Sequence, residues 1–203
     1  MDEIINTFFT HNDPILARLA DLHGADLHIP DERPLTHFVS ELCQTIVSQQ
    51  LSVKAAATIW SRAKLLAENW DDPHSILKVE DTALRQAGLS CQKVSYVKNI
   101  ARGVIDGTLN PARYSAMKEE DIIEELVKIK GIGLWTAEMF LIFALGRKDV
   151  FSHGDLGLRN AIKKHYGDLS SEQIVELSSS WSPYRSYASL LLWKSLDNEP
   201  KKS

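Results

Sequence analysis

The sequence predicts an all-α protein, and three features of its 203 residues point to this class. In most segments, apolar residues recur at intervals of three or four, as they do along the buried face of a helix. Hardly any segment alternates apolar and polar residues with the period of two that marks a half-buried strand. Residues that start or stop helices stand between the apolar-periodic segments. We therefore expect a helical protein, built as one compact unit or as two small lobes that share a core.

In the first half of the chain, capping and turn residues divide the apolar-periodic sequence into helices. Asn-Asp-Pro at 12–14 is a helix-start signal inside the first helical segment, and Ser52 is suited to cap a later helix. Glycine and proline predict a loop over 24–34, and the sequence DDPHS at 71–75 predicts a second break. The helices expected here cover residues 1–23, 35–50, 52–60, 80–85 and 92–106.

In the second half, the same kinds of signal outline further helices. The sequence at 107–111 stops the preceding helix with glycine and proline. Asp155 can begin one helix, and Ser170 with Glu172 can begin the next. The final residues, 200–203, are expected to be disordered. The helices expected here cover residues 119–128, 134–145, 156–165, 171–179 and 183–196.

The composition excludes several classes of protein. The formal charge is −4, with acidic residues early and basic residues later, which leaves room for a local positive face. The two cysteines, Cys43 and Cys91, are too few for a four-cysteine zinc or iron–sulfur site, and they predict no disulfide framework. The acidic start is unlike a signal peptide, and no apolar run reaches membrane-spanning length. We expect a protein of the reducing cytoplasm.

The most informative stretch is IKGIG at 129–133, which separates two predicted apolar helices. Glycines on both sides of one apolar residue permit positive φ and let a ligand approach the backbone closely. The helix after the turn presents free N–H groups and the positive end of its dipole, which suit a phosphate. Taken alone, the pattern also fits an ordinary corner between two helices with glycine at the helix end.

The sequence around this turn resembles a known family. The string LVKIKGIGLWTAEMF at 126–140 resembles the helix-hairpin-helix element of the base-excision DNA glycosylase superfamily, the HhH-GPD proteins. The likeness continues at the family's spacing through 149–151 and 154–159, and it includes the segments at 46–56 and 181–193. The coincidence of hairpin, spacing and a downstream aspartate favours a functional hairpin over an ordinary corner.

The resemblance covers roughly residues 35–196 and implies a two-lobed helical fold with the active-site cleft between the lobes. One lobe is expected to span about 36–146 and to contain the helix-hairpin-helix at 122–145. The other lobe would combine 1–35 with 147–203, so that the whole chain forms one catalytic unit.

Two departures from other members indicate the branch. Relatives with lyase activity carry a Schiff-base lysine at the second position after the last hairpin glycine, where this chain has Trp135. Other branches carry a four-cysteine cluster near the C-terminus, and this chain has no cysteine after Cys91. The chain is thus most similar to the 3-methyladenine DNA glycosylase II branch. This implies a monofunctional enzyme with no iron–sulfur cluster and no required cofactor.

The resemblance implies one catalytic residue and three residues that bind the substrate. Asp155 matches the essential aspartate, which stabilises a cationic sugar, orients or deprotonates the attacking water, or does both. An aspartate here also suits a helix N-cap. Aromatic faces bind electron-poor alkylated purines. The substrate-binding residues implied are Trp135, Met139 and Trp193, of which the first two share one helix face.

Two positions depart from the family pattern within this site. Some relatives have tyrosine where this chain has Met139, and a thioether is softer and longer than a phenol ring. Relatives often place a proline shortly before the essential aspartate, whereas this loop contains His153. The histidine could line the pocket or contact DNA, but an exposed loop histidine is the simpler expectation.

The remaining implied contacts are with DNA and with one ion. A side chain must fill the gap left by the flipped base, and Gln50 or Leu51 is the candidate, although a polar helix end explains the same residues. The predicted DNA-binding residues are Gln49, Gln50, Leu51, Gly131, Ile132, Gly133 and Thr136. The backbone carbonyls expected to hold a monovalent cation are those of Val127, Ile129 and Ile132.

The resemblance predicts release of 3-methyladenine, 7-methylguanine and similar alkylated purines from damaged double-stranded DNA. We expect a monomer that binds DNA in the cytoplasm, associated with the nucleoid, and needs neither a membrane nor an obligate protein partner. Two alternatives remain. A non-catalytic helix-hairpin-helix DNA-binding module would leave Asp155 and Trp193 dispensable. A related glycosylase would remove deaminated or etheno bases instead.

Overall fold

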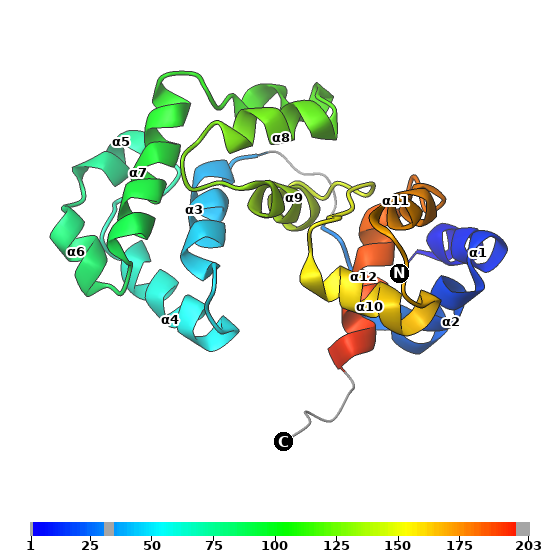
Figure 1. Cartoon of the computed structure of the whole chain (residues 1–203). Coiled ribbons are helices and arrows are strands. Elements are labelled where there is room, and N and C mark those ends of the chain that lie inside the picture. The colour runs from blue at the N-terminus through cyan, green and yellow to red at the C-terminus, as the bar shows by residue number, and fades with distance from the viewer. Residues whose placement is uncertain (1, 31–34, 198–203) are drawn as a thin grey trace. The chain divides into compact units, whose positions relative to one another are not determined.

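The computed structural model describes residues 2–30 and 35–197, and all regular secondary structure in these ranges is helical. The all-α prediction is confirmed. No helix within the described ranges has the length and apolar character needed to cross a membrane. The helices drawn in Figure 1 are, in chain order, α1 (Glu3–Asn12), α2 (Pro14–His23), η1 (Gly24–Asp26), α3 (Phe38–Ser48), α4 (Val53–Lys64), α5 (Pro73–Lys78), α6 (Asp81–Gln86), α7 (Cys91–Ile105), η2 (Pro111–Ala116), α8 (Glu119–Val127), α9 (Leu134–Phe143), α10 (Leu156–Tyr166), α11 (Ser171–Ser179) and α12 (Arg185–Asp197).

The chain folds into two compact units. The terminal unit combines Met1–Glu32 with Gly146–Ser203 and holds α1, α2, η1, α10, α11 and α12. The central unit is Arg33–Leu145 and holds α3 to α9 together with η2. The predicted loop over 24–34 begins with the short helix η1. Residues 31–34, at the end of this loop, lie outside the described residues. The same holds for Met1 and for the tail at 200–203 that was expected to be disordered.

A buried aspartate divides the first predicted helical segment into α1 and α2. Asp13 has an extended backbone, and its Oδ1 accepts hydrogen bonds at 2.9 Å from the N–H groups of Ile15 and Leu16. Its Oδ2 accepts hydrogen bonds at 2.8 Å from the Tyr166 hydroxyl and from the Trp181 indole. The expectation of one continuous helix over the first 23 residues was therefore wrong, because this carboxylate ends α1 and caps α2. The start signal at 12–14 is confirmed.

Within the central unit, α9 is apolar apart from Thr136 and Glu138. Its residues from Thr136 to Ile142 are buried, and a helix of this kind needs neighbours all round. α3 and α8 contact it, while α7 packs on α3 and α5 (Figure 1). The short helix α5 falls in the predicted break and was not predicted. Asp72 caps α5 by accepting the His74 N–H at 2.9 Å, and Pro73 occupies its first turn.

The segment that leads into α10 is fastened to the start of α12. The Asp149 carboxylate accepts two hydrogen bonds from Arg185, at 2.8 Å from Nε and 3.0 Å from Nη2. The Ser186 hydroxyl is fully buried, accepts the Val150 N–H at 2.9 Å and donates to the Arg147 carbonyl at 2.7 Å. These bonds connect the backbone at 147–150 to the first residues of α12.

Replacing Asp149 by Asn should lower the free energy of unfolding at neutral pH by about 1–3 kcal/mol, because charge-assisted hydrogen bonds are lost. Burial raises the pKa of Asp149, but hydrogen bonds from Arg185 and Ser182 outweigh that effect and hold the pKa below its ordinary value. The stability from a depressed pKa is fully present above the unfolded value of about 4 and is lost as the pH falls through the folded value.

Urea unfolding of wild type and Asp149→Asn across a pH series measures this dependence. The stability difference between the two proteins should be complete at neutral pH and should shrink below about pH 4. A difference of the same size at neutral pH and at about pH 2 would contradict the assignment.

Candidate functional site

The turn between α8 and α9 is held on one side and open on the other. Gly131 has a φ of +113°, and a β-carbon there would lie 2.2 Å from Cγ of Tyr96, so the tyrosine ring packs directly on the backbone. Gly133 has a φ of −90°, and no atom lies within 4 Å of the position of a β-carbon. Ile129 and Ile132 are buried beneath the turn, where the Ile132 N–H donates to the Ile129 carbonyl at 3.0 Å.

The first turn of α9 presents backbone donors at this open side. The first N–H groups of any helix lack acceptors within the helix, and Gly133 supplies no side-chain cap to those of α9. Leu134 and Trp135, on the same turn, are exposed. Donors combined with the positive end of the helix dipole suit a phosphate group.

Thr136, like Ile132, is a predicted DNA-binding residue whose side chain lies in the interior. It is 4% exposed, and its Oγ1 accepts a hydrogen bond from Gln49 Nε2 at 2.9 Å. The same amide nitrogen lies 3.5 Å from the Gly131 carbonyl oxygen. Gln49 and Thr136 therefore connect the end of α3 to the hairpin, and both side chains are already engaged within the protein.

The loop after α3, residues 49–51, presents the other two candidates outward. Gln50 has a φ of +56°, which is uncommon for a residue with a β-carbon. Gln50 is exposed, and Leu51 is 38% exposed although apolar. The structure thus separates the three: Gln49 is anchored, whereas Gln50 and Leu51 are available to a ligand. We call residues 49–51 the wedge loop.

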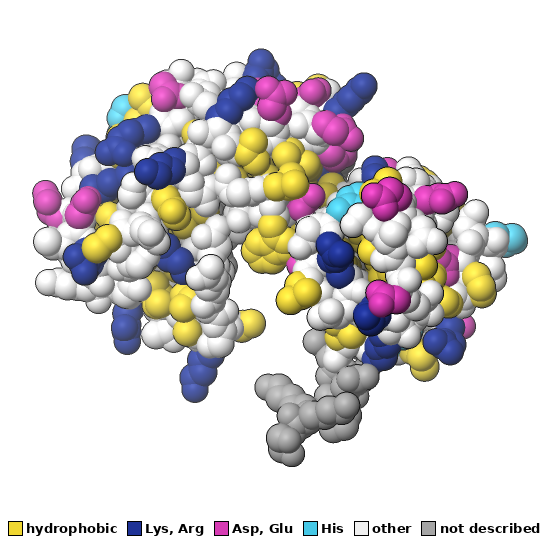
Figure 2. All heavy atoms as spheres, in the orientation of Figure 1, with side chains coloured by type: hydrophobic (Ala, Val, Ile, Leu, Met, Phe, Trp, Pro, Cys, Tyr) yellow, Lys and Arg dark blue, Asp and Glu magenta, His cyan; other side chains and the backbone are white. Residues whose placement is uncertain are grey.

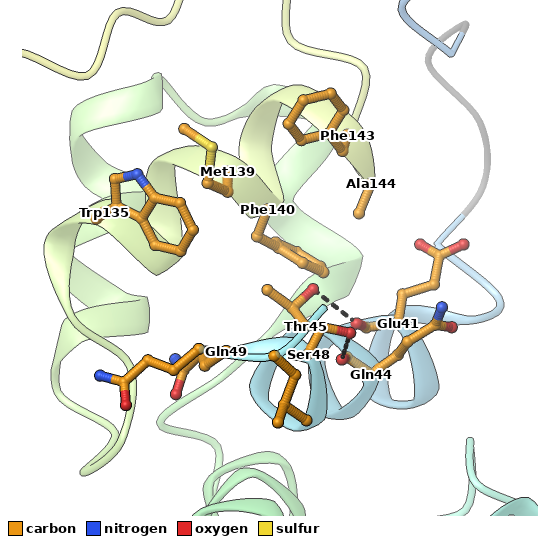
Figure 3. A pocket seen from close by; sticks show the side chains of 12 residues that line it. Glu41, Gln44, Thr45, Ser48, Gln49, Trp135, Met139, Phe140, Phe143 and Ala144 are labelled. Carbon is orange, nitrogen blue, oxygen red and sulfur yellow. Dashed lines mark hydrogen bonds between the residues drawn. The ribbon is translucent and has the colours of Figure 1, made fainter. Parts of the chain in front are cut away.

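A cavity of about 490 Å³ in the central unit brings together the wedge loop and two of the three predicted substrate-binding residues, Trp135 and Met139, while the third, Trp193, lies in the terminal unit. Trp135 and Met139 form part of one wall, where Trp135 is 46% exposed and Met139 only 7%. Figure 3 shows side chains of α9 facing side chains of α3 across this space. The lining residues are Glu41, Gln44, Thr45, Ser48, Gln49, Gln50, Leu51, Trp135, Met139, Phe140, Phe143 and Ala144.

The α3 wall of this cavity was not predicted, although the sequence contains a signal for it. Glu41, Gln44, Thr45 and Ser48 follow the helical spacing of three and four and form a polar stripe on a helix whose other residues are largely buried. Phe143, 46% exposed at the end of α9, was also missed. A polar stripe of this kind faces either solvent or a cavity, and the sequence cannot distinguish the two.

In the terminal unit, Asp155 and Trp193 form a hydrogen-bonded pair. Asp155 Oδ1 accepts the Leu158 N–H at 2.8 Å, which makes it the N-cap of α10, and accepts the Trp193 indole N–H at 2.9 Å. A β-carbon at Gly157 would lie 3.0 Å from Asp155 Oδ1 and 3.1 Å from Trp193 Cδ1, so a glycine leaves room for the pair. The carboxylate therefore has a defined direction.

His153, two residues before Asp155, is an exposed loop residue, as expected, and its ring makes two contacts. Its Nε2 lies 3.0 Å from Ser178 Oγ, and its ring meets Phe151 edge-on at 5.0 Å. Burial and the nearby Arg185 cation lower the pKa of His153, so the ring is neutral at neutral pH. This contact fastens the loop to α11.

Solved structures define the class of protein to which this fold belongs. A DNA-3-methyladenine glycosidase from Bacillus halodurans has a TM-score of 0.83 at 35% identity, covering 97% of this chain and 90% of that one. A 3-methyladenine DNA glycosylase from Schizosaccharomyces pombe, solved with abasic DNA, has a TM-score of 0.79 at 30% identity, covering 96% and 97%. The fold is therefore that of the helical DNA glycosylases.

The sequence comparisons define the family. The model of the HhH-GPD superfamily base excision DNA repair proteins matches residues 43–183. DNA-3-methyladenine glycosylase 1 of Schizosaccharomyces pombe is 35% identical over 161 residues, covering 76% of this chain and 70% of the relative. The chain belongs to the HhH-GPD superfamily, in its 3-methyladenine DNA glycosylase branch. It spans 58% of the length of a Bacillus subtilis relative that is 35% identical over 166 residues.

The two hairpin glycines should respond differently to alanine. Gly131→Ala places a methyl group against Tyr96 at a positive φ, so we expect a loss of about 2 kcal/mol or more in the free energy of unfolding. Gly133→Ala has open space and a negative φ, so the loss should stay below about 1 kcal/mol. Thermal and urea unfolding measure both, and equal losses would contradict the close packing at Gly131.

Proposed function

We propose that this protein is a monofunctional DNA glycosylase. It hydrolyses the N-glycosidic bond of flipped-out alkylated purines, of the 3-methyladenine and 7-methylguanine type, in duplex DNA. The observation that carries the proposal is Asp155, whose carboxylate is fixed at the start of α10 by Leu158 and Trp193. Relatives named as DNA-3-methyladenine glycosylases support the substrate class.

The cavity in the central unit has the chemistry that such a substrate needs. Alkylation at the purine N3 or N7 puts positive charge on the ring and weakens its glycosidic bond. The faces of Trp135 and Phe143 suit a cationic ring, and the Met139 thioether is polarisable. The Glu41 carboxylate on the opposite wall adds a favourable charge. The cavity therefore favours purines that carry the positive charge created by alkylation.

Asp155 would act on the sugar and on water. Water attacks the sugar C1′ while the bond to the base breaks, and the electron pair of that bond leaves with the base as a neutral purine. The Asp155 carboxylate balances the positive charge that develops on the sugar and accepts the proton from the attacking water. The donors Leu158 and Trp193 orient it for both tasks.

The residue at 135 supports hydrolysis without strand cleavage. An indole cannot form the Schiff base that a lyase requires, so water is the nucleophile and the product is an abasic site. No iron–sulfur cluster or other required cofactor is part of this proposal.

We propose that the damaged double-stranded DNA is held by the hairpin and opened by the wedge loop. The backbone at 131–133 would bind a phosphate, and Gln50 or Leu51 would fill the gap left by the flipped base. Thr136 would contribute to DNA binding indirectly, by accepting the hydrogen bond that holds Gln49 in the wedge loop. Basic and acidic side chains are interspersed on the face drawn in Figure 2.

A monovalent cation at the hairpin carbonyls of Val127, Ile129 and Ile132 would bridge to the same phosphate. The Ile129 oxygen already accepts the Ile132 N–H, and a carbonyl has a second lone pair for an ion. One pocket suffices for the chemistry, so we propose that the protein acts as a monomer, without an obligate protein partner, in the cytoplasm at the nucleoid.

Two other functions make different predictions from the same residues. A non-catalytic DNA-binding module would need the hairpin but neither Asp155 nor the cavity. A glycosylase for deaminated or etheno bases would keep Asp155 but would bind neutral rings, for which the Glu41 carboxylate offers no advantage.

A panel of lesion duplexes tests the proposed function. Wild type should release 7-methylguanine and 3-methyladenine, and strands should break only after alkali. Asp155→Asn should lower the rate by about 100-fold or more while DNA affinity and stability stay the same, since Asn also caps helices. Asp168→Asn is a matched control, because Asp168 pairs with Lys163 at 2.9 Å in the same unit.

The outcomes of the panel separate the alternatives. Binding without base release would favour the non-catalytic module. Wild-type excision by Asp155→Asn would contradict the catalytic assignment. Release of deaminated or etheno bases alone would change the substrate class, and breakage without alkali would overturn the monofunctional assignment.

Binding to DNA should weaken with salt, because phosphate contacts release counterions. Each contact contributes about −0.9 to the slope of log affinity against log salt. Lys130→Gln in the hairpin turn should make the slope shallower by about 1. Lys78→Gln at the end of α5 serves as a control that should leave the slope unchanged. Fluorescence anisotropy at several salt concentrations measures this, and affinity independent of salt would refute phosphate binding at the hairpin.

A further inference from the structure

Lys93 occupies an unfavourable position in its own helix. It lies in the first turn of α7, where Ser90 Oγ accepts its backbone N–H at 3.2 Å, and a cation is disfavoured at this end of a helix dipole. Its Nζ instead reaches the C-terminal end of α3 and donates to the carbonyls of Val47 at 2.8 Å and Gln49 at 2.7 Å. Burial lowers the pKa of Lys93. The hydrogen bonds to the end of α3 explain why a lysine stands at this position, whereas the helix dipole of α7 does not favour one there.

The two carbonyls that Lys93 contacts lie directly before the exposed part of the wedge loop. The last carbonyls of a helix lack donors within it, and a cation there is favoured by the dipole. The next residue, Gln50, has its φ at +56°, and such a conformation persists only where the surroundings fix it. Leu51 follows and is exposed. Lys93 thus fixes the backbone from which the candidate wedge side chains project.

The same helix also holds the hairpin. Tyr96 follows Lys93 by one turn and packs on Gly131, and Asn99 follows by another and donates from Nδ2 to the Lys130 carbonyl at 3.1 Å. Three side chains of α7, spaced three residues apart, therefore hold the backbones of the wedge loop and of the hairpin turn. The Gln49 side chain also joins the wedge loop directly to the start of α9, because its Nε2 donates to Thr136 Oγ1 at 2.9 Å.

We propose that Lys93 is a positioning residue that sets the wedge loop against the hairpin for base extrusion. It does not touch the reacting atoms. Opening a base pair requires a side chain to enter the stack while the backbone is held, so the separation of the two protein segments has to be fixed in advance. The proposal rests on the proposed glycosylase function for its kinetic test, but not for its binding test.

The kinetic test compares Lys93→Met, which keeps the length of the side chain but removes its charge and donors, with Lys98→Met. Lys98 lies on the same helix and pairs with Asp81 of α6. The substrates contain 7-methylguanine, either paired with cytosine in a duplex or unpaired in a single strand. Lys93→Met should be about 10-fold slower on the duplex and within about 2-fold on the single strand. Lys98→Met should match wild type on both.

The binding test uses a duplex with 2-aminopurine beside a tetrahydrofuran abasic-site analogue. Saturating wild type should raise the fluorescence as the wedge enters the stack, and Lys93→Met should give a smaller rise at saturation. The positioning role would be overturned if Lys93→Met slowed base release equally from the duplex and from the single strand. A fluorescence rise with Lys93→Met equal to that of wild type would also overturn it. A wild type that raises the fluorescence but releases no base would refute the glycosylase and leave the fluorescence comparison to decide on Lys93.

Discussion

The contact between the Tyr96 ring and the backbone of Gly131 is the constraint on which the candidate site in the central unit depends. Only glycine allows α7 and the hairpin turn to approach this closely. The direction of α9 follows from the turn, and with it the positions of Trp135 and Met139 in the first and second turns of the helix. A helix advances about 1.5 Å per residue, so the phosphate donors and the aromatic wall are separated by a fixed, short distance.

Three of the groups to which we assign function lie at helix ends. Gly133 begins α9, Asp155 begins α10, and Gln49 follows the last residue of α3. Helix ends carry backbone donors or acceptors without partners inside the helix, so they supply polarity that needs no charged side chain. They are also where the chain changes direction, so a short loop such as 49–51 can project a side chain from a rigid base. A purely helical protein thus gains binding sites without long loops.

Periodicity and capping residues predicted most of the fold. Ser52 and Asp155 cap the helices they were expected to cap, because an N-cap is a local interaction between neighbours in sequence. The start signal at Asp13 was recognised, but its burial was not, because the second oxygen bonds Tyr166 and Trp181, far along the chain. The helix α5 was missed because Asp72 and Pro73, which cap and begin it, were interpreted as a break.

The candidate site was predicted unevenly for the same reason. The hairpin glycines and Asp155 were selected by the resemblance to the family, because by residue type alone they also fit an ordinary helix corner and a helix N-cap. The burial of Thr136 and the role of Lys93 depend on which helix lies alongside which, and residue spacing does not contain that information. From the sequence, Lys93 is indistinguishable from an ordinary surface lysine. The structure shows that its ammonium donates to two carbonyls at the C-terminal end of α3.

The net charge of −4 is compatible with DNA binding once the charges are placed along α8. Its acidic residues at 119–121 occupy the first turn, where they complement the helix dipole. The hairpin turn follows the other end of this helix, roughly 13 Å away at 1.5 Å per residue, and charges at physiological salt are screened over about 8 Å. Lys128 and Lys130 lie at the turn itself, where Lys128 balances the charge of Glu124 at 3.4 Å. A phosphate at the hairpin therefore experiences the local donors and lysines, and the acidic end of α8 serves helix stability without opposing it.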